Sequence, residues 1–155
     1  MINGSVEKMW TNYLESLGES HNNTDKTYTA WYFCDNKQDA DELAELVLEG
    51  TKKATASLYL YYSSENEGLP KEGELSIITN WEGEAKCIIR TSSIDIVPFK
   101  DVTEEFAQTE GEGDKSLKYW KRAHKNYFSR ELIGLGREFN EDILVVCEKF
   151  EVVYK

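Results

Sequence analysis

The residues Gly50-Thr51-Lys52-Lys53-Ala54-Thr55-Ala56-Ser57 join a predicted helix to a predicted strand. Ahead of them, apolar residues recur at the helical period, and we expect Asp39 or a neighbouring residue to cap that helix. Gly50 is a suitable end, because glycine adopts the left-handed backbone at low cost. From Ala54, small apolar residues alternate with hydroxyl-bearing ones, which is typical of a strand. Side chains at such a corner are held rigidly, and this makes it the first candidate site.

The rest of the chain supplies helices and strands in an order that favours an α+β fold. Helices are predicted at 5–17, 103–107 and 117–135, with a polar loop at 19–26. Strands are predicted at 28–33, 74–79, 85–97 and 143–153, with turns at 68–73 and 80–83. Because strands return after long helical stretches, we expect a small mixed β-barrel decorated by helices instead of a βαβ repeat. We expect one domain over 1–155, with an N-terminal helix and loop at 1–26 and a core at 27–155.

The charge of the chain restricts what it can bind. Its 29 acidic and 18 basic residues give a net charge of −11. A protein that follows a long polyanion normally presents a basic face, because phosphate contacts supply most of the affinity. The average field of this chain repels nucleic acid. A role with RNA therefore requires a local basic pocket or a small substrate.

Cysteine, histidine and the N-terminus bear on metal sites and location. The three cysteines, Cys34, Cys87 and Cys147, are far apart, and the only histidines are His21 and His124. A zinc site needs about four well-placed ligands, so we expect no metal and no cofactor. Free cysteines in apolar runs are typical of a reducing compartment. The N-terminal residues include charges and no continuous apolar run, so we expect neither a signal peptide nor a membrane span and predict a cytoplasmic protein.

At the corner, Lys52 and Thr55 suggest two kinds of chemistry. A lysine beside a threonine hydroxyl can activate it if desolvation lowers the lysine pKa. The same lysine could instead hold a phosphate as a point charge. A purely structural reading is also open, because lysines after a helix C-terminus interact favourably with its dipole and carbonyls.

The second candidate site is the segment Glu110-Gly111-Glu112-Gly113-Asp114. Its three carboxylates could serve as a general acid or base or bind an amine, and the glycines would allow close approach to a ligand. The structural alternative is a flexible, solvated acidic loop in which Asp114 caps the next helix.

The long predicted helix is the third candidate. Six basic residues and no acidic one occur between Lys115 and Arg130, which reverses the sign of the overall charge. Trp120, His124 and Tyr127 share one helical face, so an aromatic face with a basic flank could stack a base and hold its phosphate. The alternative is an ordinary amphipathic helix with an aromatic core stripe.

Taken in order, these segments resemble the ASCH domain family of the PUA-like superfamily, in its longer bacterial type. The resemblance covers about 31–154. The matching segments are Gly50-x-Lys52-x-x-Thr55, which fits the family signature GxKxxT, then Val97-Pro98-Phe99, Glu110-Gly-Glu-Gly-Asp114, Ser116-Leu117 with Trp120 and His124, and Val145-Val-Cys-Glu148.

The resemblance implies a β-barrel whose cleft carries the GxKxxT segment, and a partner that is RNA or a modified nucleoside or nucleotide. Some small family members are amidohydrolases that remove the acetyl group of acetylcytidine. Carried over, Lys52 would assist, Thr55 would be the nucleophile and Glu110 the partner glutamate. Another member is reported as a ribonuclease.

Two features depart from the family pattern. Many small members have arginine two places after the threonine, where this chain has Ser57. Two lysines are also adjacent: motif spacing selects Lys52, whereas strand alternation puts Lys53 on the face of Thr55, unless the chain bends at Lys53-Ala54.

The leading hypothesis is a hydrolase of a modified nucleoside or nucleotide. The alternatives are a non-catalytic RNA-binding module, using Lys52, Lys53, Arg90, Trp120 and the basic helix, and a ribonuclease. Besides the catalytic set, the expected substrate-binding residues are Lys53, Ser57, Arg90, Glu112, Asp114, Trp120 and His124.

Overall fold

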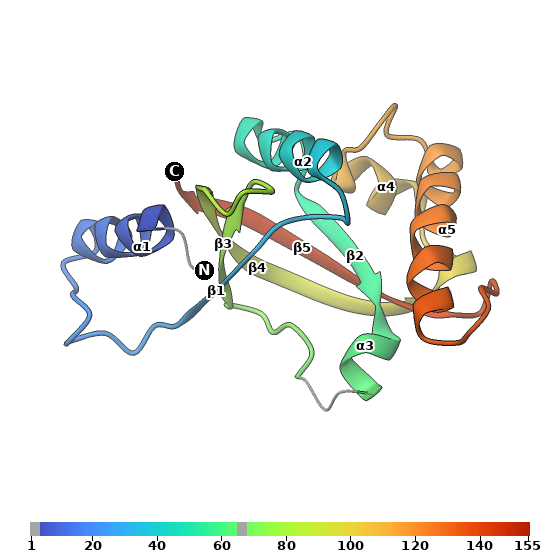
Figure 1. The fold of residues 1–155 in the computed structure, drawn as a ribbon, viewed down its shortest axis with the longest axis horizontal. Coiled ribbons are helices and arrows are strands. Elements are labelled where there is room, and N and C mark those ends of the chain that lie inside the picture. Colours follow the sequence, from blue (N-terminus) through green and yellow to red (C-terminus); the bar gives the residue numbers. More distant parts are fainter. Residues whose placement is uncertain (1–3, 65–67) are drawn as a thin grey trace.

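The computed structural model describes residues 4–64 and 68–155, so residues 1–3 of the predicted N-terminal segment lie outside the described part. Its elements follow one another as α1 (Gly4–Ser16), β1 (Tyr28–Trp31), α2 (Lys37–Glu49), β2 (Ala54–Leu58), α3 (Tyr59–Ser64), β3 (Leu75–Thr79), β4 (Ala85–Pro98), η1 (Phe99–Asp101), α4 (Glu104–Glu110), α5 (Leu117–Gly134) and β5 (Leu144–Tyr154). Figure 1 shows α1 at one end of the molecule and α4 and α5 at the other.

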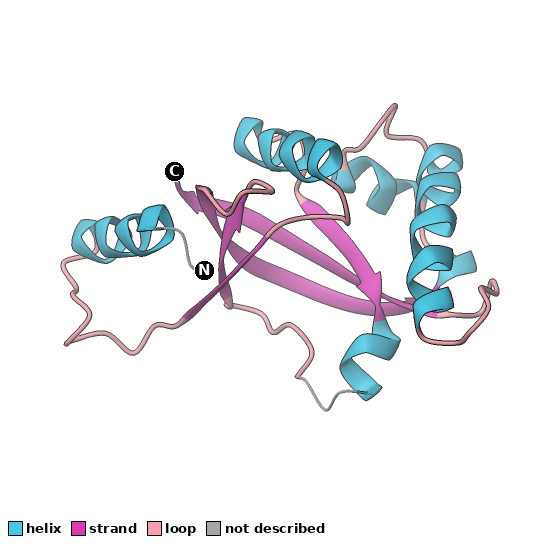
Figure 2. Cartoon of the chain, in the orientation of Figure 1, coloured by secondary structure: helices cyan, strands magenta, loops and turns pink. Residues whose placement is uncertain are grey.

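The strands form a five-stranded mixed sheet in the order β1-β3-β4-β5-β2. β1 is parallel to β3, and the other neighbouring pairs are antiparallel. The long strands β4 and β5 form the centre, and their register shifts at Ile88/Ile89 and at Thr91/Ser93. Such bulges bend strands and increase their twist, and Figure 2 shows the helices arranged around the resulting curved sheet.

The prediction of a β-barrel is wrong, because the strands form an open sheet. β1 and β2 are the two edges of the sheet, and within residues 4–64 and 68–155 no pairing joins them. Closure would require both edges of every strand to be paired. β1 has only four residues and β2 has five, so each offers a short edge. The fold is therefore α+β with an open mixed sheet.

Helices cover both faces of the sheet and create three apolar clusters. α1 packs on β3 and β4 through residues such as Trp10, Ile77 and Ile88. α2 packs on the opposite face, because Ile78 and Cys87, the strand neighbours of Ile77 and Ile88, contact its side chains. No helix in the described part of the chain is long and apolar enough to cross a membrane.

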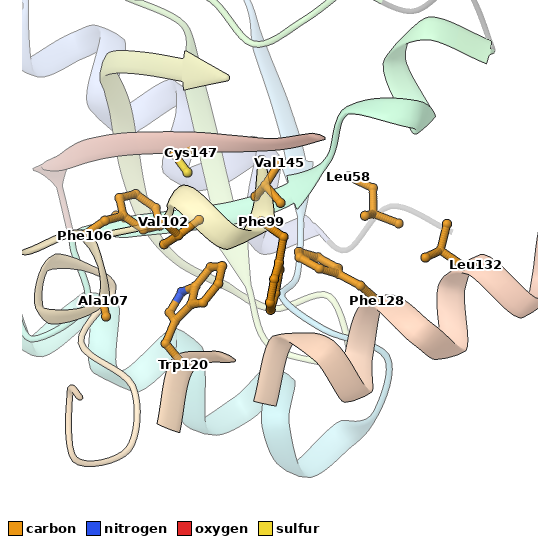
Figure 3. Close-up of a cluster of buried hydrophobic side chains, with 11 residues drawn as sticks. Leu58, Phe99, Val102, Phe106, Ala107, Trp120, Phe128, Leu132, Val145 and Cys147 are labelled. Atoms are coloured by element: carbon orange, nitrogen blue, oxygen red, sulfur yellow. The ribbon is translucent and has the colours of Figure 1, made fainter. Parts of the chain in front are cut away.

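The largest cluster lies under α4 and α5 and anchors the candidate site. Figure 3 shows Phe99, Trp120 and Phe128 between α5 and the sheet. The rings of Phe99 and Trp120 lie 5.4 Å apart, and Trp120 is only 2% exposed. The aromatic stripe predicted on the long helix is thus mainly core, and the indole face of Trp120 is not open to a nucleobase.

Most helix and strand positions agree with the sequence analysis, and the differences are local. The predicted cap near Asp39 is Asn36, which accepts the Asp39 backbone N–H at 2.9 Å, and Gly50 ends α2 in the left-handed region. Helix α3 directly follows β2 and was not predicted. α4 continues to Glu110 and ends at Gly111, so Glu110 belongs to a helix and not to the acidic loop. Ser116, not Asp114, caps α5.

Candidate functional site

A pocket of about 200 Å³ lies at the corner between α2 and β2. α5 forms one wall through Tyr119, Ala123, His124 and Tyr127, and α2 forms another. Lys52, Thr55, Glu110 and Glu112 all line it. In Figure 1, α2, α4 and α5 gather around the start of β2. The structure therefore brings together segments that lie about sixty residues apart in the sequence.

The side chain of Lys52 is 1% exposed and lies in the floor of this pocket. Its Nζ donates to Glu110 Oε2 at 3.0 Å and to Glu112 Oε2 at 2.7 Å, and it lies 5.1 Å from the Phe33 ring centre. Burial alone would lower the pKa of Lys52, but the two carboxylates outweigh it and raise the pKa above its usual value. Lys52 is therefore a fixed ammonium ion.

The adjacent Lys53 is not brought to the pocket, so of the two lysines only Lys52 lines it. β2 begins only at Ala54, so strand alternation does not extend back to Lys52. The backbone of Lys53 is held on both sides, by N–H donation to Thr109 O at 2.9 Å and by accepting from Phe150 N at 3.0 Å. Its side chain is exposed, and it does not line the pocket.

The Glu110 carboxylate accepts three hydrogen bonds, although its side chain is only 2% exposed. Trp120 Nε1 donates to Oε1 at 2.6 Å, while Lys52 Nζ and His124 Nε2 approach Oε2 at 3.0 and 3.2 Å. Burial would raise the pKa of Glu110, but His124 and Lys52 hold it well below its usual range. Glu110 is therefore an anion that positions its neighbours.

The contacts of His124 favour its doubly protonated form. His124 Nδ1 lies 2.9 Å from the Trp120 carbonyl oxygen, which can only accept, so Nδ1 carries a proton. Nε2 faces the ionised Glu110, which is also an acceptor, so Nε2 carries a proton as well. Burial opposes this charge, but Glu110 raises the pKa of His124 above its usual value. The imidazolium stacks on Trp120, with ring centres 4.0 Å apart.

Glu112 differs from the other charged groups because it lies at the rim. Its side chain is 19% exposed. Burial raises its pKa to about 7, and the nearby Glu110 charge adds to the rise while Lys52 opposes it. Gly111 and Gly113 flank it in the left-handed region, with φ of 73° and 57°. A Cβ on Gly111 would lie 2.2 Å from Thr51 O, so the segment is pressed against the corner and is not the flexible loop expected from its composition.

Thr55 lines the same pocket from β2. Its hydroxyl has no hydrogen-bond partner in the described part of the chain. Thr55 pairs across the sheet with Glu148 of β5, whose own carboxylate accepts from Thr91 Oγ1 at 2.7 Å. The Thr55 hydroxyl is thus available to a ligand.

Several predicted substrate-binding residues are not brought to the pocket. Arg90 is exposed on β4 and pairs with Glu151. Ser57 contacts Tyr62 at 3.0 Å. Asp114 is exposed and accepts from Ser116 N at 2.9 Å. His124 lines the pocket, whereas Trp120 lies behind it and acts through Glu110.

Other pocket residues were not among the predicted substrate-binding residues, although the sequence analysis placed Tyr127 on the aromatic face of the long helix and Arg130 in its basic run. Asp39 and Glu42 of α2 face the pocket, and Tyr119, Tyr127 and Arg130 line it from α5. Arg130 pairs with Asp35 through its Nε at 3.2 Å. The helical spacing of 119, 123, 127 and 130 could have indicated a second face of α5, but nothing local tied that face to α2.

Glu110, Glu112 and His124 offer potential metal-ligand atoms within 4.8 Å of one another. Their protonation does not suit a metal ion. The ammonium group of Lys52 already lies within 3.0 Å of both carboxylates, and Nε2 of His124 has a proton in place of a free lone pair. The cluster is an ion-pair network built around lysine.

Comparisons with known proteins place this geometry in context. A family model described as ASCH domain matches residues 29–154. The crystal structure of an ASCH domain from Lactobacillus crispatus JV V101 is 41% identical, with a TM-score of 0.92, covering 99% of this chain and 97% of that one.

The crystal structure of protein EF3133 from Enterococcus faecalis V583 is 36% identical, with a TM-score of 0.85, covering 97% and 88% of the two chains. Hypothetical protein PH0355 shares the fold at 20% identity, with a TM-score of 0.53, covering 81% of this chain and 97% of that one. No curated protein matches the chain.

Proposed function

The chain belongs to the ASCH domain family, and from this premise we propose that it is a hydrolase that cleaves an acyl amide of a small modified nucleoside. The observation that carries the proposal is the convergence of Lys52, Thr55 and Glu110 on one pocket. A hydroxyl without a hydrogen-bond partner among the described residues and a fixed ammonium ion line the same pocket, and acyl transfer needs a nucleophile and a positive charge for the developing oxyanion.

In this proposal Thr55 Oγ1 attacks the amide carbonyl and forms an acyl-enzyme. Lys52 does not take the threonine proton, because its pKa is raised and the group is already protonated. It instead supplies positive charge to the oxyanion. Glu110 holds the Lys52 ammonium in place through the 3.0 Å hydrogen bond and is itself fixed by Trp120 and His124.

The size and charge of the pocket favour a small substrate. A volume of about 200 Å³ suits a single base with its substituent better than an oligonucleotide. Asp39 and Glu42 line the α2 side, and the guanidinium of Arg130 is neutralised by Asp35. A phosphate in the pocket would meet carboxylates, so we expect a nucleoside in preference to a nucleotide.

Incubation of the purified protein with acetylcytidine, followed by chromatography of cytidine and acetate, tests the proposal. Thr55→Val keeps the shape of the side chain but removes the hydroxyl, so turnover should fall by on the order of 10³-fold or more. Thr55→Ser, the matched control, keeps the hydroxyl and should retain measurable turnover. A wild-type protein that releases no cytidine, or a Thr55→Val variant as active as wild type, would refute the assignment.

RNA binding is the second candidate, and the outer face of α5 supports it. Lys118, Arg122 and Lys125 are exposed there, against the acidic average of the chain. If RNA binds this face, its affinity should fall steeply as salt rises, and Lys118→Gln with Lys125→Gln should weaken binding and reduce the salt slope by about 2. Binding that is undetectable, or insensitive to salt, would remove this candidate.

A further inference from the structure

Acyl transfer from Thr55 needs a group that can accept a proton near neutral pH. The cluster of charged groups at the pocket consists of Lys52, Glu110, Glu112 and His124, and three of these four are unsuited to accept that proton. Lys52 is already protonated, His124 carries protons on both ring nitrogens, and the pKa of Glu110 is held well below its usual range by those two cations. The proton acceptor must therefore be sought elsewhere at the pocket.

Glu112 is the remaining group of the cluster. It lines the pocket together with Thr55. Among the described residues it forms one ion pair, with Lys52 Nζ at 2.7 Å, whereas the Glu110 carboxylate accepts from three donors. The 19% exposure of its side chain lets it exchange protons with water. The two left-handed glycines fix the direction of its backbone against Thr51 and the Tyr119 ring.

We propose that Glu112 is the general base and acid of the site, a role that rests on the proposed acyl transfer. The Thr55 Oγ1–H proton passes to the Glu112 carboxylate as the Oγ1–C bond forms. The C–N bond then breaks, and Glu112 returns the proton to the leaving amine. In the second half, water gives a proton to Glu112 as it attacks the ester, and that proton returns to Oγ1 as the carboxylic acid leaves.

The charges around Glu112 suit this exchange. Lys52, at the corner, donates a hydrogen bond to Glu112. Glu110 at the end of α4 and His124 and Tyr119 of α5 interact with Glu112 electrostatically. With Glu112 ionised, the two cations and two carboxylates balance. Once Glu112 has taken the proton, the cluster has one excess positive charge, at the stage when the substrate oxygen becomes negative. Preorganised charge of this kind lowers the barrier of acyl transfer.

Glu148 is the rival carboxyl group. It is the register partner of Thr55 on the neighbouring strand β5. Its side chain is buried, and burial raises the pKa of the Glu148 carboxyl group. Its carboxylate, however, already accepts from Thr91 at 2.7 Å, and it does not line the pocket. These facts favour Glu112, and the experiment below separates the two.

The test compares the pH dependence of acetylcytidine hydrolysis in wild type, Glu112→Gln and Glu148→Gln, with Glu15→Gln on the exposed face of α1 as the control. Wild-type kcat/KM should fall as pH drops below about 7, the pKa given to Glu112 by burial. Glu112→Gln should lose about 100-fold or more at pH 8 together with this acidic limb. Retention of the limb in Glu112→Gln, or its loss in Glu148→Gln alone, would overturn the proposal.

A measurement that needs no activity separates this inference from the proposed function. Carboxyl NMR titration should give Glu112 a midpoint near neutral pH, absent from the Glu112→Gln spectrum. Since the pKa of Glu112 is higher in the folded than in the unfolded state, the folded state holds an extra proton between about pH 4.5 and 7. The free energy of unfolding of wild type should therefore decline relative to that of Glu112→Gln as pH rises through that window.

An ordinary midpoint near 4.5 would refute the role of Glu112 even in an active enzyme. A neutral midpoint in a protein that hydrolyses no acyl nucleoside would instead reject the proposed function and, with it, the catalytic role.

Discussion

A lysine that is 1% exposed is tolerated only because its charge is balanced where it lies. A buried ion pair adds little net stability over an apolar replacement, but removal of one partner leaves the other charge buried and uncompensated. At Lys52 two carboxylates would be left facing each other. The residue is therefore coupled to folding as well as to the proposed chemistry.

We expect Lys52→Met to lower the free energy of unfolding by about 3–5 kcal/mol, the usual cost of an orphaned buried charge. Lys53→Met is the matched control, because the neighbouring side chain is exposed and should change stability by less than about 0.5 kcal/mol. Urea denaturation at pH 7.5 measures both. Equal effects of the two substitutions would contradict the buried network.

At the scale of elements, the junction between α4 and α5 sets the position of both glutamates. Gly111 caps the end of α4 and Gly136 lies two residues beyond the end of α5, and both are in the left-handed region, with φ of 73° and 70°. A side chain at either site meets the same backbone strain, about 1–2 kcal/mol. They differ in their surroundings: a Cβ at Gly111 would lie 2.2 Å from Thr51 O, whereas nothing lies within 4 Å at Gly136.

Gly111→Ala should therefore destabilise the protein by about 1–3 kcal/mol more than Gly136→Ala, because backbone must move to relieve the overlap. It should also displace Glu110 and Glu112 from Lys52, so the neutral carboxyl titration of Glu112 should shift toward its ordinary range. Denaturation curves and carboxyl NMR of the two variants provide the comparison. Similar stability and an unshifted titration in both would show that the close approach is unimportant.

The sequence predicted elements well where one local signal was decisive. Gly50 and the alternation from Ala54 located the corner to within a few residues, whereas the helix predicted to end at Ala107 continues to Glu110. The sequence could not choose between Lys52 and Lys53, because alternation applies only once the strand has begun. Nor could it reveal that Trp120 faces the core, since one aromatic stripe suits a core or a stacking surface equally. Nor could it show that Tyr119 and Tyr127 face a pocket, because the other wall of that pocket is α2, which is distant in sequence.

At the scale of the whole molecule, the barrel expected from the family resemblance gives way to an open sheet with helices on both faces. Closure is decided by pairings between β1 and β2, which no local pattern encodes. The outer face of α5, with Lys118, Arg122 and Lys125 exposed, is basic, whereas the chain as a whole has a net charge of −11. The core is divided, since the cluster under α1 and the cluster under α5 lie at opposite ends of the sheet (Figure 1).

Because the core is divided in this way, we expect that a substitution in the cluster under α1 can lower the free energy of unfolding without changing the pocket. Trp10 is 4% exposed, and its ring packs 4.6 Å from that of Tyr28 in the cluster under α1. Trp10→Ala should lower the free energy of unfolding by about 3–5 kcal/mol through the cavity it leaves. The Glu112 titration midpoint should not move, provided that the sample is folded. Ile133→Ala, at a side chain that is 76% exposed, is the control and should change stability by less than about 0.5 kcal/mol. A shifted Glu112 midpoint in folded Trp10→Ala protein would mean that the two ends of the sheet are coupled and that the pocket depends on α1.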